Sequence, residues 1–273
     1  MIVRILGSGS KGNSVLLEAG DTRVLIDAGF SPRGVQARLE AFEVAPTSIE
    51  AVIITHEHTD HVGSAAKCAK KWGWRILASA GTRTGCASLA KASVETISGS
   101  ALISIGELEL KTIAVSHDAN EPLAVIATSQ KTGARTGIVY DLGICTERLL
   151  KSLRDLDILI IEANHDPELL RFGPYPPVLQ RRIASRYGHL SNDASARAVG
   201  ECVHKGLSEV ILAHLSQKNN TPKIAMETVQ AVLRRTSFQG RVTPASQGRV
   251  TGPFAPKGAS HRSPKQLELS LGV

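Results

Sequence analysis

The 273-residue sequence predicts an α/β domain in which two strand-rich halves pack their sheets against each other, with helices on the outside. Two observations support this prediction. Short β-branched and aliphatic runs alternate with stretches of helical length along most of the chain. Hydrophobic residues make up 42% and charged residues 21% of the sequence, a composition that excludes global disorder and allows a large buried core.

The first half of the chain begins with three short strands separated by glycine-rich turns, which we predict as an N-terminal strand and a hairpin. A helix follows, because Ser31 is a suitable N-cap and Pro32 suits the first helical position. The predicted elements are strands 2–6, 14–18 and 23–26, a helix 32–42, a strand 51–55, a helix 63–71, a strand 75–78 and a helix 82–90.

The second half repeats the alternation of strands and helices. Its predicted elements are strands 108–115, 123–128 and 137–140, a helix 146–153, a strand 158–161, helices 177–186 and 192–205, a strand 210–213 and a helix 222–235. Beyond residue 236 the chain becomes rich in Gly, Pro, Ser, Arg and Lys. We therefore expect a folded domain over residues 1–236 and a flexible tail over 237–273, with a disordered linker at 239–265.

The formal net charge is +7, and five basic residues against one acid fall in the last 33 residues. A basic excess is typical of proteins that bind a polyanion such as nucleic acid, although a solubilising tail is an alternative. The four cysteines form no C-x-x-C pair, which favours reduced thiols. No long apolar run and no signal-peptide pattern is evident, so we expect a cytoplasmic protein without membrane contact.

The segment Thr55-His56-Glu57-His58-Thr59-Asp60-His61 carries the most specific chemical signal in the sequence. Side chains alternate along a strand, so His56 and His58 point the same way, and Asp60 and His61 can face back from a following helical turn. Imidazole and carboxylate groups together suit Zn²⁺, Mn²⁺ or Fe²⁺. Because burial of so many polar groups without a partner is costly, the cluster predicts a metal site.

The motif His56-x-His58-x-Asp60-His61 resembles the signature of the metallo-β-lactamase superfamily. This resemblance implies a four-layer αββα sandwich with a two-metal site at the edge between two sheets. It also implies that Asp27 supports the site and that Asp141 bridges both metals. The implied ligands are His56, His58, His117 and Asp141 for one divalent ion, and Asp60, His61, Asp141 and His214 for the other, the ions being Zn²⁺ or Mn²⁺.

A further set of motifs resembles the YycJ-type branch of this superfamily, over residues 1–235. These motifs lie at residues 7–14, 162–166, 173–176, 188–192, 214–216 and 219–222. The branch is described as metal-dependent 5′ to 3′ exonucleases of DNA, which implies a catalytic domain that acts in DNA repair or replication. The alternatives are a small-molecule cyclic phosphodiesterase or an RNA-processing nuclease of the same fold. A metal-stabilised DNA adaptor is less favoured, because it requires a broken ligand set.

Several other residues are candidates for catalysis or substrate binding. Besides Asp60, the candidate catalytic residues are His189 and His165, either of which can protonate the leaving oxygen; the alternative is a structural histidine. The candidate phosphate-binding residues are Ser10, Asn13, Ser14 and Asn164; for Asn13 and Ser14 the alternative is a tight turn.

The segment 266–271 resembles the short peptide by which bacterial replication and repair proteins bind the sliding clamp. Its implied contact residues are Gln266, Leu267, Leu269 and Leu271, with Leu271 where Phe is more usual. The alternatives are a frayed hydrophobic end or an edge strand added to the domain. The resemblance implies DNA and the sliding clamp as partners and a nucleoid-associated location, while the sequence leaves the oligomeric state and the native metal open.

Overall fold

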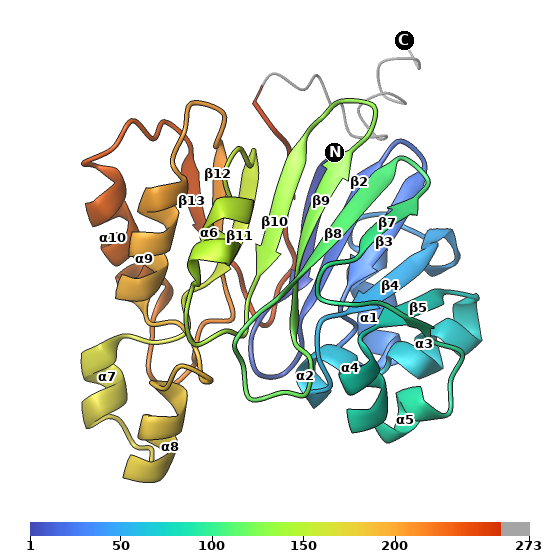
Figure 1. The fold of residues 1–273 in the computed structure, drawn as a ribbon, viewed down its shortest axis with the longest axis horizontal. Coiled ribbons are helices and arrows are strands. Elements are labelled where there is room, and N and C mark those ends of the chain that lie inside the picture. The colour runs from blue at the N-terminus through green and yellow to red at the C-terminus, as the bar shows by residue number, and fades with distance from the viewer. Residues whose placement is uncertain (258–273) are drawn as a thin grey trace.

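The computed structural model describes residues 1–257, which form two seven-stranded mixed sheets packed face to face with helices on both outer sides (Figure 1). The predicted αββα sandwich is confirmed. Among these residues, no helix has both the length and the apolar character that crossing a membrane requires.

The first sheet has the strand order β14-β1-β2-β3-β4-β5-β6. Its strands are β1 (Ile2–Gly7), β2 (Ser14–Ala19), β3 (Thr22–Ile26), β4 (Ala51–Ile54), β5 (Arg75–Ala78), β6 (Glu95–Thr96) and β14 (Thr251–Phe254). The first three pair antiparallel, as the glycine-rich turns predict, and β3 to β6 run parallel. Parallel neighbours place the ends of β3 and β4 at the same edge of the sheet.

The helices of this half are α1 (Pro32–Glu40), α2 (Thr59–Val62), α3 (Ala65–Trp72), α4 (Ala80–Gly85) and α5 (Ala87–Ala90), with a 3₁₀ turn at Pro46–Ser48. Ser31 caps α1 as predicted, since its side chain accepts a hydrogen bond from the Gly34 backbone N–H. The single helix predicted over 82–90 is wrong: Cys86 has an extended backbone and divides α4 from α5.

The second sheet has the order β13-β12-β11-β10-β9-β8-β7, antiparallel from β7 to β10 and parallel from β10 to β13. Its strands are β7 (Leu102–Ile105), β8 (Leu108–Ala114), β9 (Leu123–Ser129), β10 (Arg135–Val139), β11 (Ile158–Glu162), β12 (Glu209–Ala213) and β13 (Arg241–Pro244). Its helices are α6 (Glu147–Ser152), α7 (Pro167–Phe172), α8 (Pro177–Ile183), α9 (Asn192–Cys202) and α10 (Pro222–Leu233).

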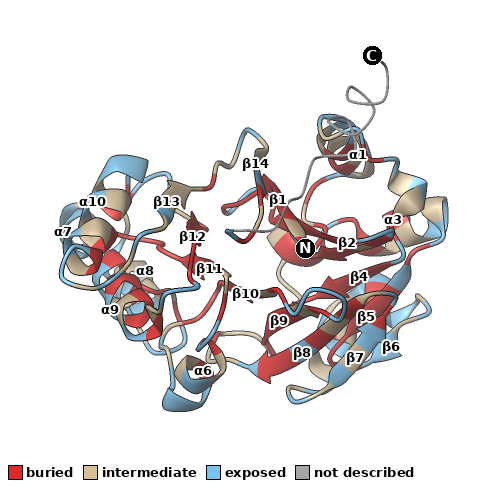
Figure 2. Ribbon diagram, turned by 90° about the horizontal axis from the view of Figure 1, so that it is seen from above, coloured by how far each residue is buried: buried red, intermediate tan, exposed pale blue. Residues whose placement is uncertain are grey.

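The core has a central layer between the sheets and an outer layer beneath the helices on each side. Strand β11 shows why its sequence is apolar throughout. Ile158 and Ile160 belong to the central layer, whereas Leu159 and Ile161 belong to the outer layer beneath the helices. Figure 2 shows the same pattern, with buried residues concentrated in the strands of both sheets.

The expected linker at 239–265 and the domain boundary at residue 236 are wrong for residues up to Lys257. Strand β13 pairs parallel with β12, and β14 pairs antiparallel with β1, so this segment adds one strand to each sheet. Short edge strands gain their pairing energy from backbone hydrogen bonds and tolerate Pro and Gly, which is why their composition resembled a linker. The remainder of the tail, including the predicted docking peptide at 266–271, lies outside the described residues.

Candidate metal centre

Three of the candidate site residues lie within two residues of a strand end and adopt a left-handed backbone conformation. Asp27 follows β3, Asp141 follows β10 by one residue, and His214 follows β12, with φ values of 63°, 53° and 53°. A left-handed non-glycine residue costs about 1–3 kcal/mol, and such strain gathers at functional sites. All three side chains are buried, and Asp141 Oδ1 lies 2.8 Å from His214 Nδ1.

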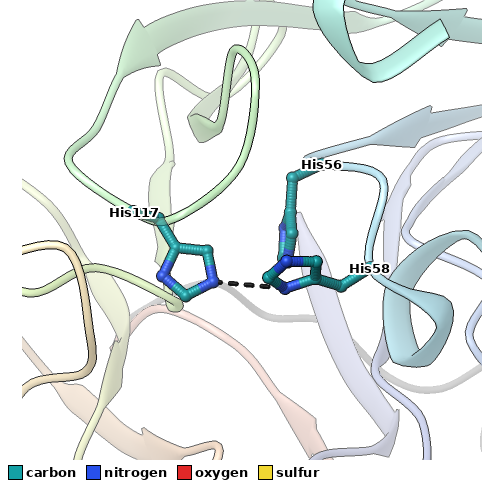
Figure 3. A group of neighbouring side chains, drawn as sticks. All are labelled: His56, His58 and His117. Atoms are coloured by element: carbon teal, nitrogen blue, oxygen red, sulfur yellow. Dashed lines mark hydrogen bonds between the residues drawn. The ribbon is translucent and has the colours of Figure 1, made fainter. Parts of the chain in front are cut away.

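The first group of ligand atoms consists of three imidazoles that face one another (Figure 3). One ring nitrogen from each of His56, His58 and His117 lies within 4.8 Å of the others. His58 Nδ1 is 3.3 Å from His117 Nε2. His117 Nδ1 donates to the Gly188 carbonyl at 3.0 Å, which leaves the Nε2 lone pair of His117 free for a ligand.

The second group of ligand atoms comes from Asp60, His61 and His214. Asp60 Oδ2 is 3.5 Å from His61 Nε2 and 3.3 Å from His214 Nε2. Asp141 lies between the two groups: its Oδ2 is 2.5 Å from His61 Nε2 and 3.8 Å from His56 Nε2, and its Oδ1 is 2.8 Å from His214 Nδ1. All seven predicted ligand residues therefore converge, with Asp141 in contact with both groups.

The buried atoms of these groups fit divalent metal ions. His56 Nε2 and both carboxylate oxygens of Asp141 are buried without a hydrogen-bond partner among residues 1–257. The short contacts of Asp141 therefore do not have hydrogen-bond geometry. Burial of His56 Nε2 and of the Asp141 oxygens costs free energy that no hydrogen bond offsets. Imidazole and carboxylate donors converging on one point suit Zn²⁺ or Mn²⁺, so the residues present fit the expected cofactor.

The fully buried carboxylate of Asp27 contacts His61, a member of the second group of ligand atoms. Its Oδ1 accepts from the Thr55 backbone N–H at 2.8 Å, and its Oδ2 lies 2.8 Å from the Thr55 and Tyr140 hydroxyls and 2.7 Å from His61 Nδ1. Burial and the adjacent Asp27 raise the pKa of Tyr140 well above its ordinary value, so its hydroxyl remains a donor. A carboxylate only accepts hydrogen bonds, so His61 carries its proton on Nδ1 and presents Nε2 to the ligand group.

A second supporting carboxylate, Glu162, was not predicted from the sequence. Its Oε1 lies 2.7 Å from His189 Nδ1 and 3.1 Å from His214 Nδ1, and its Oε2 accepts from the Leu142 and Leu190 backbone N–H groups. Burial alone raises the pKa of Glu162, but the neighbouring His189 lowers it to about 2. The available signal in the sequence was a charged residue at the end of an otherwise apolar strand.

The two candidate proton donors occupy different positions. His189 lines a cavity of about 250 Å³ together with Asp60, Asp141 and Ser10. Its Nδ1 is 3.1 Å from Asp141 Oδ1; burial lowers its pKa, but Glu162 and Asp141 outweigh burial and raise it to about 9.

His165 does not reach this cavity. It is buried and lines a separate cavity of about 470 Å³ on the other side of His189. Burial lowers the pKa of His165 to about 4. His165 is not among the residues that line the ligand cavity, and its role as a proton donor stays a prediction.

Among the predicted phosphate-binding residues, only Ser10 faces the ligand cavity. Asn13 is buried: its Oδ1 accepts from the Gly9 backbone N–H, and its Nδ2 lies 3.0 Å from His61 Nε2. Ser14 donates to the Asp27 carbonyl, and Asn164 donates to the His214 carbonyl. Interior hydrogen bonds therefore engage these three side chains and hold the site residues in place, while their contact with phosphate stays a prediction.

Comparisons with known proteins agree with this architecture. Residues 7–117 match the family model of the metallo-beta-lactamase superfamily. The chain is 32% identical over 231 residues to the exodeoxyribonuclease WalJ of Streptococcus pneumoniae, covering 82% of this chain and 85% of that protein. It is 29% identical over 239 residues to the exodeoxyribonuclease YycJ of Bacillus anthracis, covering 86% of this chain and 89% of that protein.

A solved structure extends the comparison to the fold of almost the whole chain. The short form of human tRNase Z has a TM-score of 0.64 with 18% identity, covering 93% of this chain and 100% of that one. At this identity the likeness concerns the fold alone. Together with the WalJ and YycJ relatives and the converging ligand residues, these findings show that the chain belongs to the metallo-beta-lactamase superfamily of metal-dependent hydrolases, in the group that includes WalJ and YycJ.

Proposed function

We propose that this protein is a DNA exonuclease that hydrolyses phosphodiester bonds from the 5′ end of a strand with two divalent metal ions, Zn²⁺ or Mn²⁺. The observation that carries the proposal is the placement of Asp141 between two groups of ligand atoms beside a cavity of about 250 Å³. Two adjacent metal sites are the common arrangement for phosphodiester hydrolysis. The exodeoxyribonuclease relatives, which align with more than four-fifths of the chain, support DNA as the substrate.

The protein's own residues hold and orient the reacting groups. His56, His58 and His117 would hold one ion and Asp60, His61 and His214 the other, with Asp141 shared. When bound, the ions supply Lewis-acid polarisation of the phosphate oxygens.

His189 is the candidate donor to the leaving 3′-oxygen. Its Nδ1 contacts Glu162 and Asp141, which orients the ring and leaves Nε2 as the ring atom available to substrate. Ser10 lines the cavity and is the candidate best placed to contact a terminal phosphate.

The proposed biological role is DNA repair or replication at the nucleoid, with recruitment by a sliding clamp through Gln266, Leu267, Leu269 and Leu271. This docking peptide lies outside the described residues, so it rests on the sequence pattern. The folded chain continues to Lys257, beyond the domain boundary at residue 236 that the sequence predicted. Tethering a nuclease to a ring on DNA raises its effective concentration at the substrate.

The test is digestion of single strands that carry one label, at the 5′ or the 3′ end, with Mn²⁺, Zn²⁺ and Mg²⁺ in turn. We expect labelled mononucleotide as the first product from the 5′-labelled strand, and progressively shorter fragments from the 3′-labelled strand. Asp141→Asn is the inactive control. Mononucleotide release from the 3′ label would contradict the polarity. Turnover of only a matched RNA, or only a cyclic nucleotide, would replace the DNA assignment by one of the two alternatives.

A further inference from the structure

The chain between residues 171 and 187 combines positive charge with exposed rings beside the candidate site. It contains four arginines, three aromatic residues and no Asp or Glu, whereas the whole protein has only 5 Phe, 3 Tyr and 2 Trp. We call it the arginine–aromatic segment; its members are Arg171, Phe172, Tyr175, Arg181, Arg182, Arg186 and Tyr187. It spans the end of α7, all of α8 and the loop before His189, and Figure 1 shows both helices projecting beyond the ends of the strands.

Two of the three rings of this segment are open to solvent. Phe172 is 76% and Tyr187 52% exposed, and the guanidinium groups of Arg171 and Arg186 each lie 5.2 Å from the centre of the adjacent ring. Exposed large apolar side chains beside a site suit an interaction surface. Flat apolar groups of a partner can stack on such rings.

The arginines of this segment add a second requirement. Among the residues that the structure describes, Arg171, Arg181 and Arg186 form no ion pair, whereas Arg182 binds Asp118 at 2.6 Å. Unpaired guanidinium groups beside exposed rings suit a ligand that carries both phosphates and unstacked bases.

The segment leads directly into the candidate metal centre. Tyr175 and Arg182 line the same cavity as Asp60, Asp141 and His189. Hydrogen bonds join the loop after α8 to the chain around His117. Ser116 donates to the Arg186 carbonyl at 2.8 Å, and His117 donates to the Gly188 carbonyl at 3.0 Å. The segment therefore borders the cavity of the candidate metal centre.

We propose that the arginine–aromatic segment binds the unpaired end of a DNA strand, with bases stacked on Phe172 and Tyr187 and phosphates held by the free arginines. The bases of a duplex are stacked on one another, so exposed rings cannot reach their faces without unstacking them. The cavity of about 250 Å³ is also at the small end of ligand pockets, which suits the terminal nucleotide of one strand. This inference rests on the proposed exonuclease function and names its substrate as a single-stranded or frayed end.

The test compares binding of single-stranded and blunt duplex DNA of the same sequence. The full-length protein with its metal is titrated against a fluorescein-labelled, 5′-phosphorylated oligonucleotide of phosphorothioate linkages, which resists hydrolysis, and anisotropy is recorded. Stacking on one ring typically changes affinity about 5- to 150-fold, so we expect Phe172→Ala with Tyr187→Ala to weaken single-strand binding by at least tenfold. Duplex binding should change less than threefold. The matched control is Trp72→Ala, since Trp72 on α3 also has a cation, Lys71, 4.8 Å from its ring.

Substitution of the arginines is tested by the salt dependence of DNA affinity. Each phosphate contact on a single strand contributes about 0.7 to the slope of log affinity against log salt. Arg171→Gln with Arg181→Gln should therefore lower that slope by about 1.4, whereas the control Arg234→Gln with Arg235→Gln, at the exposed end of α10, should leave it unchanged. Equal weakening of single-stranded and duplex binding, or a slope that does not change, would overturn the proposal.

A small substrate separates this inference from the proposed function. Hydrolysis of bis(p-nitrophenyl) phosphate reports on the metal centre. The substituted residues Arg171, Phe172, Arg181 and Tyr187 do not line its cavity, so the rate should be the same in wild type and in the segment variants. A wild type that cleaves this compound but no DNA would refute the proposed function. A wild type that digests DNA, with segment variants that bind single strands normally, would refute only the present inference.

Discussion

Substitution of Asp27 by Asn changes one buried atom and tests how the second ligand group is oriented. Oδ2 of Asp27 lies 2.7 Å from His61 Nδ1 and 2.8 Å from the hydroxyls of Thr55 and Tyr140. An amide nitrogen in its place donates instead of accepting. The two hydroxyls can turn to accept, but His61 must move its proton to Nε2, the atom that faces Asp141.

Two independent estimates give the size of the effect. A hydrogen bond to a charged group is typically worth about 1.5–3 kcal/mol. Loss of the partner that orients a metal-binding histidine typically weakens metal affinity about 10- to 100-fold. That range corresponds to about 1.4–2.8 kcal/mol, which agrees with the first estimate. We therefore expect Asp27→Asn to fold and to lose one to two orders of magnitude in metal affinity.

The assay is a competition titration of the metal-free protein with Zn²⁺ against a chromophoric chelator, with circular dichroism as the check on folding. Asp21→Asn, at an exposed turn between β2 and β3, is the matched control and should bind metal as wild type does. Metal affinity of Asp27→Asn within twofold of wild type would refute the argument that Asp27 sets the protonated nitrogen of His61.

Three further predictions concern the reacting groups, the backbone and the tail. His189→Ala should lower turnover of end-labelled DNA by about 10²- to 10⁴-fold with the metal content unchanged; loss of metal instead would make His189 a ligand. Gly29→Ala should destabilise the fold by about 1–3 kcal/mol in urea unfolding, since its Cβ would lie 1.7 Å from the Asp60 carbonyl oxygen, whereas Gly248→Ala meets no atom within 4 Å and should be neutral. Deletion of residues 266–273 should abolish capture by a sliding clamp in a pull-down and spare digestion of short oligonucleotides; retained capture would refute the docking peptide.

Local patterns in the sequence predicted most of the strands and a metal site at His56 to His61, and the family resemblance implied the other candidate ligands. The cluster from His56 to His61 is contiguous, and Asp27, His117, Asp141 and His214 each follow an apolar run that predicts a strand. A polar residue at a strand end can be recognised from sequence because the apolar residues before it form a buried strand. The chain turns where this apolar stretch ends.

Tertiary structure decided which polar groups line the cavity and which form hydrogen bonds in the interior. Asn13, Ser14 and Asn164 are engaged by groups distant in sequence, and Glu162 acquires its role only when β10, β11 and β12 lie side by side. The strands β13 and β14 were likewise missed, because an edge strand is stabilised by hydrogen bonds to a neighbour rather than by its own apolar pattern. Hydrogen bonds between segments far apart in sequence depend on strand register, and local residue patterns do not contain that register.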